Sequence, residues 1–197
     1  MAERLEAIPG VATAEVDQTT SLGYDTSYSV HVSIEADAST LEVAREMCDL
    51  TEQVESAYTR VTHLTLGQQV GEVETTIADD VLVCDRDVLA SARKLRDLEA
   101  SRMSTGSLEI SSGGRACTVT SGQGLDVSFG LGPDASPTEA IELLDPRTGK
   151  SRRDLDAVCE IWVYSESGIS WFTRPGQDRS GIAGLRALVA AGIVPGR

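Results

Sequence analysis

The sequence predicts an α+β protein made of two tandem ββαββα units, 1–98 and 99–197, each a four-stranded antiparallel sheet with helices on one face. Two internal matches predict the duplication. Alternating apolar residues lead into Asp-Ala-Ser at 37–39 and again at 134–136, a spacing of 97. Six residues within 85–95 recur, identical or similar, at a constant spacing of 93. Two matches in the same order indicate a repeated unit.

The elements of the first unit follow from hydrophobic periodicity. A short helix is expected before Pro9, then strands over 11–17 and 28–35 and a helix over 40–58. Ser39 and Glu42 have the spacing of a capping box at the start of that helix. The unit is completed by three further elements: strands over 61–66 and 72–78, and a helix that begins at Asp85.

The second unit repeats this order. We expect a hairpin of strands 107–111 and 115–121 that turns at Gly113 and Gly114, with an extension over 125–131. Ser136 and Glu139 rebuild the capping box of the next helix, which ends near Asp145. The remaining elements are strands over 158–164 and 169–174 and a last helix over 180–191.

The net charge of −14 is concentrated in the first unit. Residues 1–98 include 19 acidic and 7 basic side chains, whereas 99–197 include 12 and 10. This negative field disfavours direct binding to nucleic acid and to anionic membranes, and it favours a basic partner. Solubility alone is an alternative explanation. No apolar segment approaches the roughly 20 residues of a membrane-spanning helix.

The four cysteines are widely spaced, and no two of them form a CxxC pair: they are Cys48, Cys84, Cys117 and Cys159. The first residues do not show a basic segment followed by an apolar one, so no signal peptide is recognised. We therefore expect a cytoplasmic protein whose cysteines are reduced and lie in or near the core.

The strongest candidate surface is an aromatic patch on the last two expected strands, with the members Trp162, Tyr164, Phe172 and Arg174. If Ile161 and Val163 face the helices, alternation turns Trp162 and Tyr164 to the opposite side of the sheet. Rigid aromatic residues together with arginine are typical of interface centres. The patch is expected either to bind a partner or to form the seam between the two units.

A basic loop on this acidic protein is a second candidate, with the members Arg147, Lys150, Arg152 and Arg153. It could contact an anion or an acidic partner, including the first unit of another copy. The alternative is a solvated loop, because no glycine-rich phosphate cradle accompanies the charges.

Catalytic and metal chemistry have little support in the sequence. His31 and His63 lie on expected strands without a cysteine or carboxylate at a recognisable ligand spacing. Asp85 and Asp178 are expected to cap helices rather than to form a paired active site. We therefore expect no catalytic residue, no metal and no cofactor.

These observations predict a non-enzymatic protein-interaction module with a protein partner or a second copy of itself. One form is an immunity-like or antitoxin-like inhibitor of a basic toxin, and another is a subunit of a bacterial or phage assembly. The alternative is a small-ligand-binding or enzymatic pseudodimer. Its pocket between the units would be lined by Trp162, Tyr164, Arg174 and His63.

Overall fold

The computed structural model describes residues 1–20, 25–113, 124–132, 136–144, 158–165, 170–174, 183 and 186–187. Within these residues the fold is α+β, and its eight strands form a single mixed sheet in chain order. The strands are β1 (Val11–Thr20), β2 (Thr26–Ile34), β3 (Thr59–Val70), β4 (Val73–Ala78), β5 (Gly106–Ser112), β6 (Leu125–Leu131), β7 (Val158–Ser165) and β8 (Ser170–Thr173). The helices are α1 (Ala2–Glu6), α2 (Thr40–Val54), α3 (Asp80–Cys84), α4 (Arg86–Ala100) and α5 (Pro137–Leu144). None of these described helices is long and apolar enough to span a membrane.

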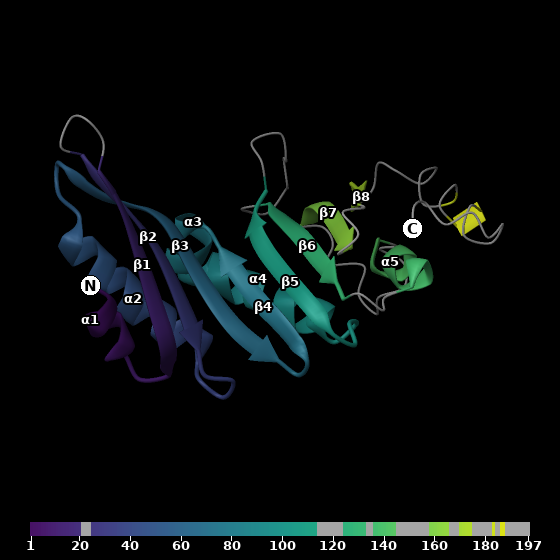
Figure 1. Ribbon diagram of the computed structural model, residues 1–197, viewed down its shortest axis with the longest axis horizontal. Helices are drawn as coiled ribbons and strands as arrows, with labels where there is room; N and C mark the ends of the chain where they lie inside the picture. The colour runs from purple at the N-terminus through teal and green to yellow at the C-terminus, as the bar shows by residue number, and fades with distance from the viewer. Residues whose placement is uncertain are drawn as a thin grey trace.

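Antiparallel and parallel neighbours alternate across the sheet. β1 and β2, β3 and β4, β5 and β6, and β7 and β8 pair antiparallel. Each of these pairs joins the next one in parallel. The parallel joins arise because a helix lies between the two strands and returns the chain to the same end of the sheet. Figure 1 shows the strands running side by side from β1 to β8.

The expectation that each unit forms a four-stranded antiparallel sheet of its own is not confirmed, because β2 with β3 and β6 with β7 pair in parallel and all eight strands form one sheet. The two halves of the chain join through β4 and β5, which pair in parallel from Val73 with Gly106 to Ile77 with Ile110. Edge strands present unpaired backbone groups, and pairing β4 with β5 satisfies both inner edges at once. Hydrophobic alternation predicts which face a strand presents, but it does not predict the neighbour of the strand.

The core lies on one face of the sheet, under the helices. Every strand from β2 to β7 turns alternate apolar side chains to this face, and the largest fully buried ones include Leu64, Ile77, Ile110 and Phe129. These residues belong to one cluster that continues across both halves of the chain. α2 and α4 are seen behind the strands in Figure 1. The expectation that the helices occupy one face agrees with this burial pattern.

The helix starts agree only in part with the expected caps. Asp85 accepts hydrogen bonds from the N–H groups of Asp87 and Val88, so it caps α4 as expected. Ser136 accepts a hydrogen bond from the N–H of Glu139 at 3.2 Å, at the start of α5. Ser39 occupies the cap position of α2, but its side chain makes no capping hydrogen bond. The first capping box is therefore incomplete.

Two stretches differ from the expected elements. β5 pairs with β6 over 125–131, whereas the expected strand over 115–121 lies outside the described residues. α3 was not expected, because five residues are too few for a helical period to show. Of the expected helix over 180–191, residues 183 and 186–187 are described, and they are helical.

The three described cysteines are all in disulfides, which contradicts the expectation that they are reduced thiols. A disulfide joins Cys48 of α2 to Cys84 of α3, with the two Cα atoms 5.7 Å apart. Cys159 of β7 is also disulfide-bonded. The pairing of Cys48 with Cys84 depends on α3, which places residue 84 beside α2. Because disulfides persist mainly in oxidising compartments, the cysteines no longer favour a cytoplasmic location.

Candidate interaction surface

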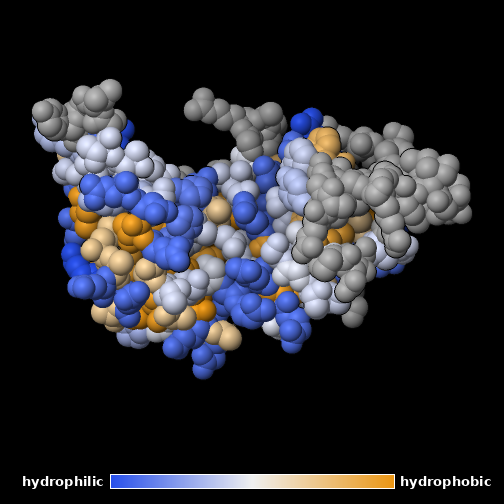
Figure 2. All heavy atoms as spheres, viewed as in Figure 1, coloured by the Kyte–Doolittle hydropathy of each residue, from blue (hydrophilic) through white to orange (hydrophobic). Residues whose placement is uncertain are grey.

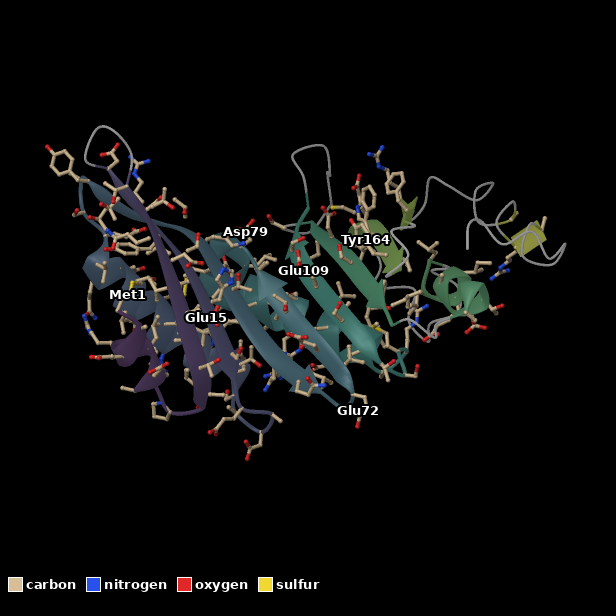
Figure 3. All side chains as sticks on the ribbon, in the orientation of Figure 1. Met1, Glu15, Glu72, Asp79, Glu109 and Tyr164 are labelled. Atoms are coloured by element: carbon tan, nitrogen blue, oxygen red, sulfur yellow. A yellow bond between two sulfur atoms is a disulfide. The ribbon has the colours of Figure 1, made fainter. Side chains whose placement is uncertain are left out.

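The face of the sheet opposite the helices crosses all eight strands, and its side chains are partly or fully exposed. Direct cross-strand partners trace one continuous row over it, with one residue from each strand: Thr13, Ser33, Gly67, Thr76, Glu109, Ser128, Trp162 and Phe172. We call this side of the sheet the open face. Glu15, Glu109 and Tyr164, labelled in Figure 3, mark its extent from β1 to β7. None of the eight residues in the row is buried.

The aromatic patch assembles at the β7–β8 end of the open face. Trp162 and Tyr164 stack with ring centroids 6.0 Å apart and planes within 5°. Phe172 is the cross-strand partner of Trp162, and their ring centroids are 4.7 Å apart. Tyr164 is 43% exposed and Phe172 is 42% exposed, which is unusual for large aromatic side chains. Three residues expected to meet on one face thus do meet there.

Arg174 completes the patch through two kinds of contact. Its guanidinium carbon lies 5.4 Å from the centroid of the Phe172 ring, in the range of a cation–π interaction. Its Nε and Nη2 atoms both donate to Glu160 Oε1, at 3.0 and 2.8 Å. The indole N–H of Trp162 donates to the other carboxylate oxygen of Glu160 at 3.1 Å. Glu160 therefore holds both the indole and the guanidinium in place.

The open face also gathers negative charge. Carboxylates project from five of its strands: they belong to Glu15, Asp17, Glu74, Glu109, Asp126 and Glu160. Four of the six are exposed. In Figure 2, which uses the same view as Figure 1, hydrophilic residues lie among pale and hydrophobic ones over the middle of the molecule. A surface with this charge attracts basic groups and repels phosphates.

The patch is not the seam between the two units. The halves meet at β4 and β5, whereas the patch lies on β7 and β8. The alternative pocket between the units is not assembled from its expected lining either, because β4, β5 and β6 separate His63 on β3 from Trp162 on β7. β3 and β7 are four strand spacings apart, which corresponds to about 19 Å. All four residues of the basic loop lie outside the described residues.

A buried polar cluster on the helix side was missed by the sequence analysis. Arg96 of α4 is only 5% exposed, and its Nη1 donates to Gln68 Oε1 at 2.7 Å. The same oxygen accepts from the Thr40 hydroxyl at 3.0 Å, and Gln68 Nε2 donates to three carbonyls of the loop before α2. Arg96 also donates twice to Asp97. These satisfied bonds indicate a structural role: the cluster ties α4 and α2 to β3.

The cluster borders a hollow of about 450 Å³ that is also lined by Gly71, Arg93 and Asp97. The sequence does not reveal the buried polar cluster, because an arginine and a glutamine in amphipathic elements are normally assigned to the surface.

Comparison with protein families, with curated proteins and with solved structures finds no match to this chain.

Proposed function

We propose that this protein is an acidic, non-enzymatic protein-interaction module that binds a basic protein through its open face. The observation that supports the proposal best is the patch of Trp162, Tyr164, Phe172 and Arg174, preassembled on an exposed sheet. Aromatic residues and arginine provide most of the binding energy at many interfaces. Glu160 holds two of the four side chains in place, which lowers the entropy lost on binding.

The charge distribution favours a basic partner. Carboxylates on the open face extend from β1 to β7, so an approaching lysine-rich or arginine-rich surface meets attraction before it reaches the aromatic patch. An inhibitor of a basic toxin and a subunit of a larger assembly both fit this chemistry. Self-association through the open face is less favourable, since two copies would bring their carboxylates together.

The proposal includes a tandem duplication, with unit boundaries as expected from the sequence. Register supports it: Ser29 pairs with His63 and His31 with Thr65, while Asp126 pairs with Glu160 and Ser128 with Trp162, at the same spacing of 97. The irregularity between Tyr28 and Ser29 recurs between Leu125 and Asp126. A shared defect in pairing is a stronger sign of common origin than shared apolar alternation, since bulges are local features specified by particular residues.

We further propose that the module works in an oxidising compartment, in place of the cytoplasmic address expected from sequence. The support is the disulfide between Cys48 and Cys84 together with the disulfide at Cys159. Counting free thiols in the protein isolated from its natural source under denaturing conditions tests this proposal. Alkylation of all four cysteines in freshly isolated, unreduced material would argue for the cytoplasm.

Affinity capture from the natural host, with the full chain as bait, tests the proposed function. Trp162→Ala is the test variant, and Tyr58→Ala is the matched control. Tyr58 is 68% exposed and lies outside the open face. The proposal predicts a stoichiometric, basic partner that wild type and Tyr58→Ala retain and that Trp162→Ala loses. Retention of the same partner by all three proteins would show that the aromatic patch is not the binding surface.

A further inference from the structure

The two histidines of the chain meet on the open face, at the end away from the aromatic patch. His31 is on β2 and His63 is on β3, and the register makes them diagonal neighbours: Ser29 pairs with His63, and His31 pairs with Thr65. Their ring centroids are 6.1 Å apart, with the planes at 63°. His63 is exposed and His31 is partly exposed. The sequence contains no other histidine.

Both imidazoles are available as ligands. Neither makes a hydrogen bond to another described residue. A neutral imidazole has one nitrogen with a free lone pair, and it is the commonest metal ligand among side chains. Two nitrogens bound to one tetrahedral ion at about 2.0–2.1 Å would place the ring centroids about 5 Å apart. The observed separation is close to this value, so the pair can chelate one ion without a change in backbone register.

Carboxylates lie beside the pair. Glu15 on β1 is the direct cross-strand partner of His31, and Asp17 is the partner of Ser29, two residues away on the same face. Direct antiparallel partners have Cβ atoms about 5 Å apart. The described residues hold no preformed group of three or more potential ligands. Rotation of the exposed Glu15 side chain is therefore required to bring in a third ligand, and water or a partner would supply the rest.

We propose that His31 and His63 bind one divalent transition-metal ion of the Cu²⁺ or Zn²⁺ type, with the Glu15 carboxylate as a third ligand. Imidazole with oxygen ligands suits these ions and disfavours Ca²⁺ and Mg²⁺, which take oxygen ligands alone. The three described cysteines are in disulfides, so their sulfurs do not compete for the ion. The net charge of −14 raises the local concentration of cations at this acidic face.

Calorimetric titration of the chelator-treated full chain with Cu²⁺, and separately with Zn²⁺, tests the site. We expect one equivalent to bind, with the tighter binding for Cu²⁺. His31→Gln and His63→Gln should each lower the affinity by more than about tenfold, and Glu15→Gln by about tenfold, because losing even an outer partner of a metal ligand costs about tenfold. Glu72→Gln is the matched control, since Glu72 is an exposed acid in the turn between β3 and β4.

Histidine proton signals in the NMR spectrum supply a second readout that is independent of any protein partner. Substoichiometric Cu²⁺ should broaden the signals of His31 and His63 together. Circular dichroism verifies that the glutamine variants are folded. Absence of binding to both ions, or a wild-type affinity in the double variant His31→Gln/His63→Gln, would overturn the proposal. This result would leave the aromatic patch and the proposed function unaffected.

Discussion

The two halves of the open face share one strand register and present different chemistry. At the paired positions of β2 and β3 the first half has His31, His63 and Thr65, and the corresponding positions of β6 and β7 have Ser128, Glu160 and Trp162. On the core side, both halves repeat buried aliphatic residues. Packing requirements are the same for both halves, so they restrain the core positions, whereas exposed positions are free to differ. Differences between the halves on the open face therefore bear on function, because packing does not restrain these positions.

The helix layers of the two halves differ as well. In the first half α2 is linked to α3 by a disulfide. α2 has fifteen residues and α5 has eight. Among the described residues, the first half therefore has the longer helix and a disulfide within its helix layer.

Removing the disulfide should have the largest effect on stability. In Cys48→Ala/Cys84→Ala, the loss of a cross-link across 36 residues should lower the free energy of unfolding by about 4 kcal/mol, because the unfolded chain regains loop entropy. Urea unfolding followed by circular dichroism measures the change. A decrease below about 1 kcal/mol would mean that the cross-link does not support the first half.

The next largest effect is on partner affinity, and it should differ between the two halves of the open face. Trp162→Ala should weaken binding of the captured partner by about 2 kcal/mol, roughly 30-fold, as expected for a central aromatic anchor. Thr65→Ala, at the equivalent first-half position, should leave the affinity unchanged. The Thr65 hydroxyl is buried without a hydrogen-bond partner among the described residues, so its removal costs little. Surface plasmon resonance measures the affinity of both variants. Equal losses of affinity would show that the two halves do not differ in binding.

The two helix starts should respond differently to the same substitution. Ser136→Ala removes an observed capping bond and should cost about 1 kcal/mol, the usual value for a lost cap. Ser39→Ala removes none and should cost a few tenths of a kcal/mol at most. Thermal unfolding of both variants measures the difference. If Ser39→Ala were the more destabilising, its side chain would be capping α2 in solution.

Neutralising one charge at the centre of the open face should have the smallest effect. Glu109 lies in the middle of the cross-strand row and is exposed. Glu109→Gln should slow association with a basic partner at low salt and change the affinity by less than about 1 kcal/mol, because exposed charges are screened. Stopped-flow measurements at two salt concentrations test this. A salt-independent rate in both proteins would exclude electrostatic steering.

Sequence patterns predicted the faces of the strands well. Alternation around Ile161 and Val163 placed Trp162 and Tyr164 together on the open face, where the rings stack. The Asp85 cap could be read in the same way, because it depends on residues within one turn. These features are local, and local spacing determines them.

Features that depend on strand neighbours or on unexpected elements were not predictable. The pairing of β4 with β5 gives one sheet in place of two, and nothing in the alternation of either strand specifies that neighbour. The bond between Cys48 and Cys84 depends on the short α3. The contact between His31 and His63 depends on the register irregularity between Tyr28 and Ser29, which shifts β2 against β3 by one residue.

Site-specific photo-crosslinking most directly tests whether the open face is the binding surface. A photoreactive residue would replace Tyr164 on the open face or, as the matched position on the helix side, the exposed Glu52 of α2. Each protein is irradiated with its captured partner, and the adducts are identified by mass spectrometry. We expect adducts from position 164 and none from position 52. Adducts from position 52 alone would show that the partner binds the helix layer and that the open face is not the binding surface.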